Sequence, residues 1–288
     1  MRLSRTLLAT GASALIAAAS LTASTGSAEA APSWAPADSA AIHPGTMMYT
    51  DGAQCTANFV YTDSAGGVYV GYAAHCAGKG ASTDTNGCNV DSVPLGTQVT
   101  FTNDGNLASE GTAVGHGTLA YSSWITEHAL GTKDANTCAY NDLALVKVDA
   151  ADVSKVNPSV PFWGGPTGID TDGTKAGDRV WTFGNSSLRA GLTPLSPHTG
   201  ISLGDDAADG GWSHPLYTVT PGVPGDSGSG FLSAGGKAVG VLSTLGLAPL
   251  PASNNIGDLA KELAFAQAHS GISGLTLALG TEPFNPIL

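Results

Sequence analysis

Between Met47 and Ser243 the sequence is a series of short apolar runs, and this pattern limits the fold more than any other feature. Each run is a few residues long, is rich in β-branched and aromatic residues, and is bounded by Gly, Asn or Asp. Such runs predict strands joined by tight turns. The predicted strands are Asn58–Thr62, Val68–Ala73, Thr97–Thr102, Thr118–Tyr121, Leu143–Val148, Val180–Phe183, Leu216–Thr220, Gly230–Leu232 and Ala238–Ser243. The pattern favours an all-β fold of barrels or sandwiches over alternating strands and helices.

One segment near the C-terminus has the periodicity of a helix. Ile256–Ala268 places Leu259 and Leu263 on one face. Asn254 or Asn255 can cap its start, because an Asn side chain accepts hydrogen bonds from the first free N–H groups of a helix. We expect this helix to pack against a barrel.

The first 30 residues have the pattern of a secretory signal peptide. Arg2 and Arg5 precede an apolar stretch, Leu7–Leu21, and small residues surround Ala30, where we expect cleavage. The apolar stretch is too short and its flanks too polar for a membrane anchor. We therefore expect a secreted protein whose residues 31–46, rich in Ala, Pro and Ser, form a flexible start.

The four cysteines are predicted to form disulfides. An even number of cysteines in a secreted chain is typical of disulfide pairing, and four cysteines allow three pairings. The chain has no Cys-x-x-Cys or His-x-x-x-His spacing, so the sequence does not predict a zinc site. The cysteines are Cys55, Cys76, Cys88 and Cys138.

The net charge excludes some classes of partner. At −12 the chain is repelled by nucleic acid and by anionic membrane surfaces. An acidic loop, Asp170–Gly173, partly follows the pattern of a calcium loop, but the last ligand position in that register is Arg179, which has the wrong charge. We expect neither a metal nor a cofactor.

A small-residue segment, Pro224–Gly230, contains a candidate nucleophile. Such a turn allows backbone N–H groups to converge on one point, where they stabilise a developing oxyanion while a serine oxygen attacks a carbonyl. Ser227 would be that serine, and the N–H groups of Gly225 and Ser227 would be the donors.

Two further residues complete a catalytic set with Ser227. A serine hydroxyl is a weak nucleophile at neutral pH and needs a positioned base, for which His is well suited. His75 follows one apolar run, and Asp142 begins another at Leu143. An Asp in this place can accept a hydrogen bond from the imidazole and fix its tautomer.

Taken together, three segments resemble the signature segments of chymotrypsin-like serine proteases, in particular secreted enzymes of Gram-positive, actinobacterial type. They are Ala73–Cys76, Asn141–Leu145 and Gly225–Gly230, in the order His, Asp, Ser. The resemblance implies two six-stranded antiparallel β-barrels packed face to face, with the site between them and the helix at the C-terminus. We place the barrels at residues 47–160 and 161–254, and the helix and tail at 255–288. The resemblance also implies a Cys55–Cys76 disulfide, which leaves Cys88 with Cys138.

The resemblance further implies the activity of a serine endopeptidase. His75, Asp142 and Ser227 would be the triad, acting on protein or peptide substrates through an acyl-enzyme, and we expect a monomer. Substrate-binding positions carried over from the family are Pro221, Ser243, Thr244 and Leu245. Since position 221 holds no carboxylate and Leu245 replaces a smaller residue, we expect a preference for small or apolar side chains at the cleavage site.

One acid, which the family resemblance implies to be buried, has no partner in these motifs. Asp226 lies beside the nucleophile, and a buried carboxylate needs a cation. The chain has two arginines after residue 30, Arg179 and Arg189. We expect Arg179 to pair with Asp226; the alternative is that Arg179 is a solvated residue at a strand end.

Two other functions remain open from the sequence. An esterase of the α/β-hydrolase class requires Gly-x-Ser-x-Gly and the order Ser, Asp, His. Gly225 precedes Ser227, but Ser229 stands where the second Gly is required, although Asp258 and His269 follow in order. A catalytically inactive relative that binds a partner would keep the same fold.

Overall fold

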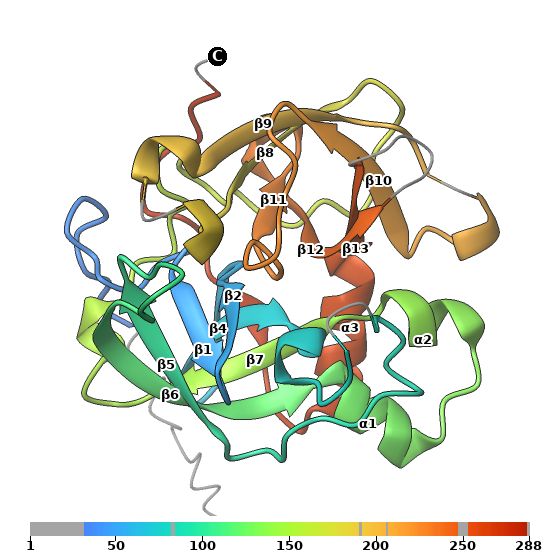
Figure 1. Ribbon diagram of the computed structural model, residues 1–288, viewed down its shortest axis with the longest axis horizontal. Coiled ribbons are helices and arrows are strands. Elements are labelled where there is room, and N and C mark those ends of the chain that lie inside the picture. The colour runs from blue at the N-terminus through green and yellow to red at the C-terminus, as the bar shows by residue number, and fades with distance from the viewer. Residues whose placement is uncertain (1–31, 82–83, 190–191, 206, 247–252, 287–288) are drawn as a thin grey trace, which may run out of the picture.

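The computed structural model describes residues 32–81, 84–189, 192–205, 207–246 and 253–286. Within them the strands form two units, which lie one above the other in Figure 1. The predicted signal peptide, residues 1–30, lies outside the described residues.

The first unit is an eight-stranded antiparallel sheet in the order β14-β3-β4-β7-β6-β5-β1-β2. Its central strands carry the apolar runs of the sequence, and every residue of Val68–Ala73 is buried. Its strands are β1 (Met47–Thr50), β2 (Ala53–Thr56), β3 (Val60–Thr62), β4 (Val68–Ala73), β5 (Gln98–Asn103), β6 (Thr112–Ser122), β7 (Leu143–Val148) and β14 (Thr276–Leu277).

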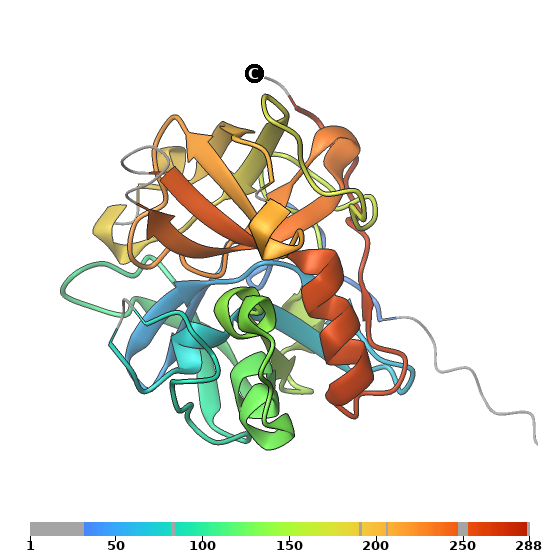
Figure 2. The ribbon, with the colours of Figure 1, turned by 90° about the vertical axis from the view of Figure 1, so that its right-hand side faces the viewer.

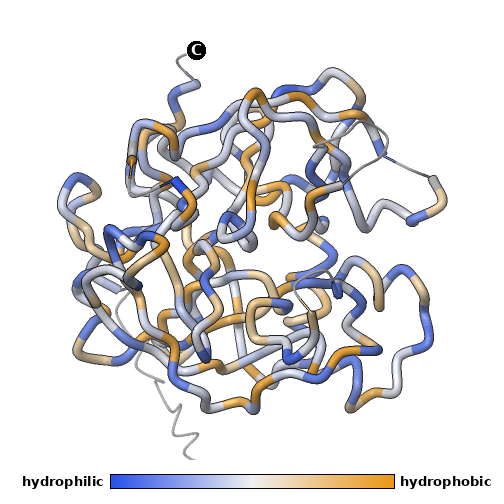
Figure 3. The backbone as a smooth tube through the Cα atoms, viewed as in Figure 1, coloured by the Kyte–Doolittle hydropathy of each residue, from blue (hydrophilic) through white to orange (hydrophobic). Residues whose placement is uncertain are grey.

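The second unit is a closed six-stranded barrel in the order β10-β13-β12-β11-β8-β9. Its own core is a small cluster of buried side chains that includes Val180, Leu216 and Ile256. Figure 3 shows that the backbone of this unit, in the upper half of the picture, carries both hydrophobic and hydrophilic segments. Its strands are β8 (Arg179–Phe183), β9 (Pro197–Ser202), β10 (Ser213–Thr218), β11 (Gly230–Leu232), β12 (Ala238–Gly246) and β13 (Ser253–Asp258).

The predicted all-β class and the two packed units are confirmed. Each of the nine predicted strands overlaps an observed strand. The first sheet has eight strands rather than six, because the short strands β2 and β14 extend its two ends. A larger hydrophobic core joins the units, since it includes Tyr72 and Leu145 of the first and Trp181 and Val241 of the second.

The helices differ from the prediction. The C-terminal helix α3 (Leu259–His269) begins three residues after the predicted start, because Ser253–Asp258 pair as β13. Asp258, not Asn254 or Asn255, caps it by accepting a hydrogen bond from Lys261 N at 2.8 Å. Two short helices, α1 (Ser123–Leu130) and α2 (Ala135–Tyr140), were not predicted. Figure 2 shows α3 extending from the barrel along the side of the first unit.

Both disulfides follow the pairing that the family resemblance implies. Cys55–Cys76 joins β2 to the 3₁₀ turn η1 (Ala74–Ala77), and its Cα atoms are 6.1 Å apart. Cys88–Cys138 joins the loop before β5 to α2, and its Cα atoms are 5.1 Å apart. The described residues contain no helix long and apolar enough to cross a membrane.

The buried His214 of β10 connects the barrel to Asp258, the residue that caps α3. His214 Nδ1 lies 2.6 Å from Asp205 Oδ1, and its Nε2 lies 2.9 Å from Asp258 Oδ2. Burial lowers the pKa of His214, but hydrogen bonds to both carboxylates and their charges outweigh it and raise the pKa overall. The imidazole is therefore held in its charged form over a wider pH range than in the unfolded chain.

Replacing His214 with Gln is expected to remove a pH-dependent part of the stability. Because the folded pKa of His214 is raised, its contribution is complete below the unfolded pKa of about 6.5 and is lost as pH rises through the folded value. The difference in unfolding free energy between the wild type and the variant should thus be larger at about pH 6 than at about pH 9. Urea titrations at the two pH values measure it, and a difference that stays constant or grows with pH contradicts the assignment.

Candidate active site

An open cleft of about 580 Å³ lies where the two units meet. From the first unit, Gln54 and His75 line it, and from the second, Gly225, Ser227 and Ser243 line it. The three predicted catalytic residues are therefore close to one cleft, although Asp142 itself is buried behind His75.

Strand pairing brings His75 and Asp142 together. β4 pairs with β7 so that Ala73 lies opposite Leu143, which places the residues beyond these two strand ends side by side. Ala74 N donates to the carbonyl of Asp142 at 2.9 Å and fixes the turn. The Cys55–Cys76 disulfide anchors the residue that follows His75.

The carboxylate of Asp142 holds the His75 imidazole and its backbone. Oδ2 is 2.7 Å from His75 Nδ1, and Oδ1 accepts from His75 N at 2.8 Å. Burial lowers the pKa of His75, whereas the charge of Asp142 and its hydrogen bond raise it, and the net direction is upward. With Nδ1 bonded to the carboxylate, Nε2 is the nitrogen available as a base toward the cleft.

Ser243 also binds Asp142, which the sequence analysis did not predict. Its Oγ donates to Asp142 Oδ2 at 2.6 Å, so this residue of β12 connects the barrel to the acid of the first unit. Ser243 was expected only as a substrate-binding residue.

Two buried glutamates lie next to Asp142. Glu262 of α3 accepts from Asp142 N at 3.0 Å, and Glu127 of α1 accepts from Asn141 Nδ2 at 3.0 Å. Burial, reinforced by the negative charge of Asp142, raises the pKa of Glu127 to about 8 and the pKa of Glu262 well above its usual value. Glu127 is therefore mainly protonated at neutral pH, and for Glu262 the same causes favour the protonated form.

The segment around Ser227 presents two free donors. Gly225 O accepts from Thr56 Oγ1 at 2.8 Å, Asp226 N donates to Val223 O at 2.9 Å, and Gly228 N donates to Leu242 O at 2.7 Å. Among the described residues, the N–H groups of Gly225 and Ser227 donate to no protein acceptor. They are the two donors that the sequence predicted for an oxyanion hole.

Glycine is required at two positions of this segment. Gly225 has a φ of +98° and Gly228 a φ of +88°, a region that disfavours side chains. A Cβ at residue 228 would lie 2.7 Å from Thr56 O, so the segment packs directly against the first unit. This contact explains how a loop of the barrel reaches the His75 side of the cleft.

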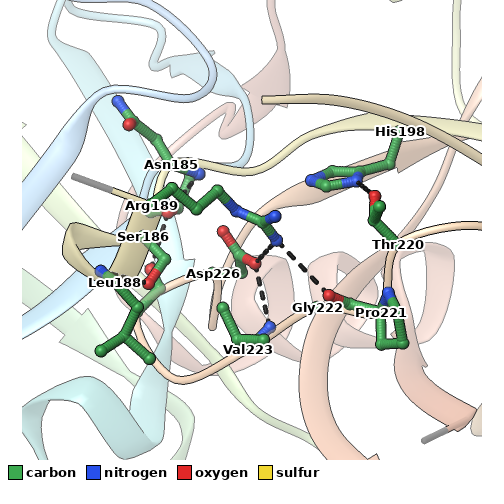
Figure 4. A network of polar contacts seen from close by, with 12 residues as sticks. Asn185, Ser186, Leu188, Arg189, His198, Thr220, Pro221, Gly222, Val223 and Asp226 are labelled. Atoms are coloured by element: carbon green, nitrogen blue, oxygen red, sulfur yellow. Dashed lines mark hydrogen bonds and ion pairs between the residues drawn. The ribbon is translucent and has the colours of Figure 1, made fainter. Parts of the chain in front are cut away.

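Asp226 is paired with Arg189, not with Arg179. Asp226 Oδ2 bonds Arg189 Nη2 and accepts from Val223 N at 2.9 Å, as Figure 4 shows. Asp226 is 1% and Arg189 11% exposed, so this is a buried ion pair. Arg179 begins β8 on the exterior, and its guanidinium lies over the Trp181 ring at 5.3 Å. The expectation for Arg179 was wrong because the turn η3 (Ser187–Arg189), which carries the other arginine, was not predicted.

Three of the four predicted substrate-binding residues line the cleft. Ser243, Thr244 and Leu245 all line the cleft. Pro221 is not among its lining residues, and its carbonyl instead accepts from Arg189 Nη2 at 3.4 Å. Its neighbour Gly222 does line the cleft, as do Leu242 and Asn254.

No hydrogen bond joins Ser227 Oγ and His75 Nε2 among the described residues, although both side chains line the cleft. In substrate-free sites such bonds are often long and shorten only when substrate is bound.

The alternative catalytic residues of an esterase, Asp258 and His269, do not lie together with Ser227 in the cleft. Asp258 caps α3 and pairs with His214, while His269 packs on Phe265 on the outer end of that helix.

No family model and no curated protein matches the sequence. Among solved structures, the chain is similar to Thermobifida fusca Protease A, with 16% identity and a TM-score of 0.49 over 83% of this chain and 99% of that chain. It is similar to Nocardiopsis protease with 18% identity and a TM-score of 0.46 over 82% of this chain and 98% of that chain. It is similar to Cellulomonas bogoriensis chymotrypsin with 17% identity and a TM-score of 0.43 over 82% of this chain and 98% of that chain.

Proposed function

We propose that this chain is a secreted serine endopeptidase that uses Ser227 as nucleophile, His75 as general base and Asp142 as the orienting acid. The observation that carries the proposal is the cleft itself. A histidine held by a buried carboxylate lines the same cleft as Ser227, and the N–H groups of Gly225 and Ser227 donate to no acceptor among the described residues. Acyl transfer requires these three elements: a nucleophile, a base and donors for an oxyanion.

The mechanism follows from these positions. His75 Nε2 removes the proton of Ser227 as the hydroxyl oxygen attacks the peptide carbonyl, and Asp142 stabilises the imidazolium that forms. The carbonyl oxygen becomes an oxyanion that accepts hydrogen bonds from Gly225 N and Ser227 N. The protonated imidazole then donates its proton to the leaving amine, and water, activated by the same base, hydrolyses the acyl-enzyme.

Small or apolar side chains are the proposed preference at the cleavage site. Among the described residues, those of the barrel that line the cleft carry no charged group, and Leu245 is half exposed. Asn254 is buried, and its amide bonds the backbone of Gly222 in both directions, at 2.8 and 3.3 Å, so little of it is left for a substrate. A barrel wall without charged groups offers no ion-pair partner to a charged side chain, and the apolar Leu242 and Leu245 favour small or apolar groups there.

Secretion belongs to the same proposal. Two disulfides within the described residues fit an oxidising compartment. Residues 1–30 would be removed as a signal peptide, which sequencing of the N-terminus of exported protein would test.

Labelling with a fluorophosphonate tests the catalytic assignment. The wild-type protein should be labelled at Ser227 and should hydrolyse casein, whereas Ser227→Ala should show neither reaction. Ser229→Ala is the matched control, because Ser229 is a buried serine two residues away whose hydroxyl forms no hydrogen bond among the described residues. Labelling that persists in Ser227→Ala, or no labelling of the folded wild type, contradicts the proposal. A peptide library then reports the preferred side chain and separates a protease from an esterase.

A further inference from the structure

The peptide between Pro224 and Gly225 carries one of the two oxyanion donors, and a single side chain holds its other end. In a trans peptide, the C=O and N–H groups point in opposite directions. Pro224 O accepts from Ser186 Oγ at 2.5 Å on one side. Gly225 N is therefore turned to the opposite side, where it has no protein acceptor among the described residues.

The Ser186 hydroxyl is itself fixed by its surroundings. Ser186 is fully buried, and its oxygen accepts from Leu188 N at 3.1 Å. This bond occupies an acceptor lone pair and directs the hydroxyl hydrogen toward Pro224 O. Arg189 N donates to Ser186 O at 3.0 Å, so the same turn presents the hydroxyl to Pro224 and the guanidinium to Asp226. Figure 4 shows Ser186 and Arg189 approaching the segment from this turn.

The remaining anchors of the segment do not hold this particular peptide. Gln54 Nε2 and Thr56 Oγ1 both donate to Gly225 O, which belongs to the next peptide. Proline lacks an N–H, and a glycine such as Gly225 can adopt φ of either sign with little cost. Without the hydroxyl of Ser186, the peptide can rotate and turn a carbonyl instead of an N–H toward the oxyanion.

We propose that Ser186 is a positioning residue that keeps the Gly225 N–H directed into the oxyanion hole. The inference rests on the proposed function, because it assigns a role within that site. Ser186 touches neither substrate nor the reacting atoms, and it acts through the orientation of one peptide.

The test compares Ser186→Ala with Ser186→Thr, which keeps the hydroxyl, and with Ser187→Ala as matched control. Active sites are first counted by fluorophosphonate titration, so that each rate refers to folded, reactive enzyme. In Ser186→Ala we expect kcat per titrated site to fall about tenfold with KM nearly unchanged, as the loss of one hydrogen bond predicts. A peptide boronate, whose tetrahedral adduct places an oxygen in the hole, should bind about tenfold more weakly. A peptide product should bind as before, and Ser187→Ala should behave as the wild type.

Different failures are distinguishable. Unchanged kcat per site and unchanged boronate affinity in Ser186→Ala overturn the inference. A lower melting temperature and fewer titratable sites, with normal kinetics at the remaining sites, also overturn it, because Ser186 is then only structural. If Ser186→Thr folds and titrates fully but has the defect of Ser186→Ala, the hydroxyl is not the cause and the inference fails. A wild type that does not react with the fluorophosphonate overturns the proposed function and this inference together.

Discussion

Asp142→Asn is expected to lower kcat by about four orders of magnitude and to leave KM and the fold nearly unchanged. The reason lies in one fixed donor, the backbone N–H of His75. Oδ1 accepts from the backbone N–H of His75, which is always a donor, so the amide oxygen of Asn must take this place. The NH₂ group then replaces Oδ2 and faces His75 Nδ1. Nδ1 becomes an acceptor, the ring proton moves to Nε2, and the imidazole can no longer accept the proton of Ser227.

Steady-state kinetics on one peptide substrate, with sites titrated as above, measure this loss. Asp149→Asn is the matched control, since Asp149 is an exposed acid beyond the other end of β7. It should keep wild-type kinetics. An Asp142→Asn enzyme that retains a tenth or more of the wild-type kcat would show that the tautomer of His75 does not limit the reaction.

Arg189→Gln is expected to cost about 3–5 kcal/mol of unfolding free energy and most of the activity. The substitution leaves the 1% exposed carboxylate of Asp226 without its cation. Asp226 stands between Gly225 and Ser227, which supply the two proposed oxyanion donors, so we expect its displacement to disturb both. Loss of one such donor alone lowers kcat by about 10²–10³.

The chain supplies a matched control for this experiment in Arg179. Arg179→Gln removes an equal charge from an exposed strand end, and we expect changes in unfolding free energy within about 0.5 kcal/mol and normal kinetics. Urea unfolding and kinetics of the two variants measured in parallel decide between the arginines. The reverse order of effects would show that Asp226 is not stabilised by Arg189.

The strands were predictable because their signal is local. Val68–Ala73, Leu143–Val148 and Gly230–Leu232 are apolar runs that end at turn-forming residues, and the structure has strands with these bounds. By contrast, β9 (Pro197–Ser202) contains a Pro, a His and a Gly, and its register depends on Thr199 lying opposite Trp181. Such pairing is a tertiary effect that overrides local preference.

The same distinction applies to the candidate site. His75, Asp142 and Ser227 stand in recognisable motifs, so the sequence alone predicts them as a set. Arg189 and Ser186 belong to no motif, and their roles depend on a turn that bends back to the Ser227 segment. Counting arginines reduced the possible partners of Asp226 to two, but sequence position could not show which one the fold buries.

Glu262 of α3 contacts Asp142 but follows Ser227 in the sequence, so the candidate site is incomplete until the C-terminal part of the chain has been made. This residue accepts the hydrogen bond from Asp142 N, and β14, still nearer the C-terminus, pairs with β3 at the edge of the first sheet. The ribosome therefore synthesises Ser227 before it synthesises Glu262 and β14, which support Asp142 and the first sheet. Under the proposed function, a growing chain would carry Ser227 before the site is complete, so that proteolysis would begin only once synthesis has reached the C-terminal strand β14.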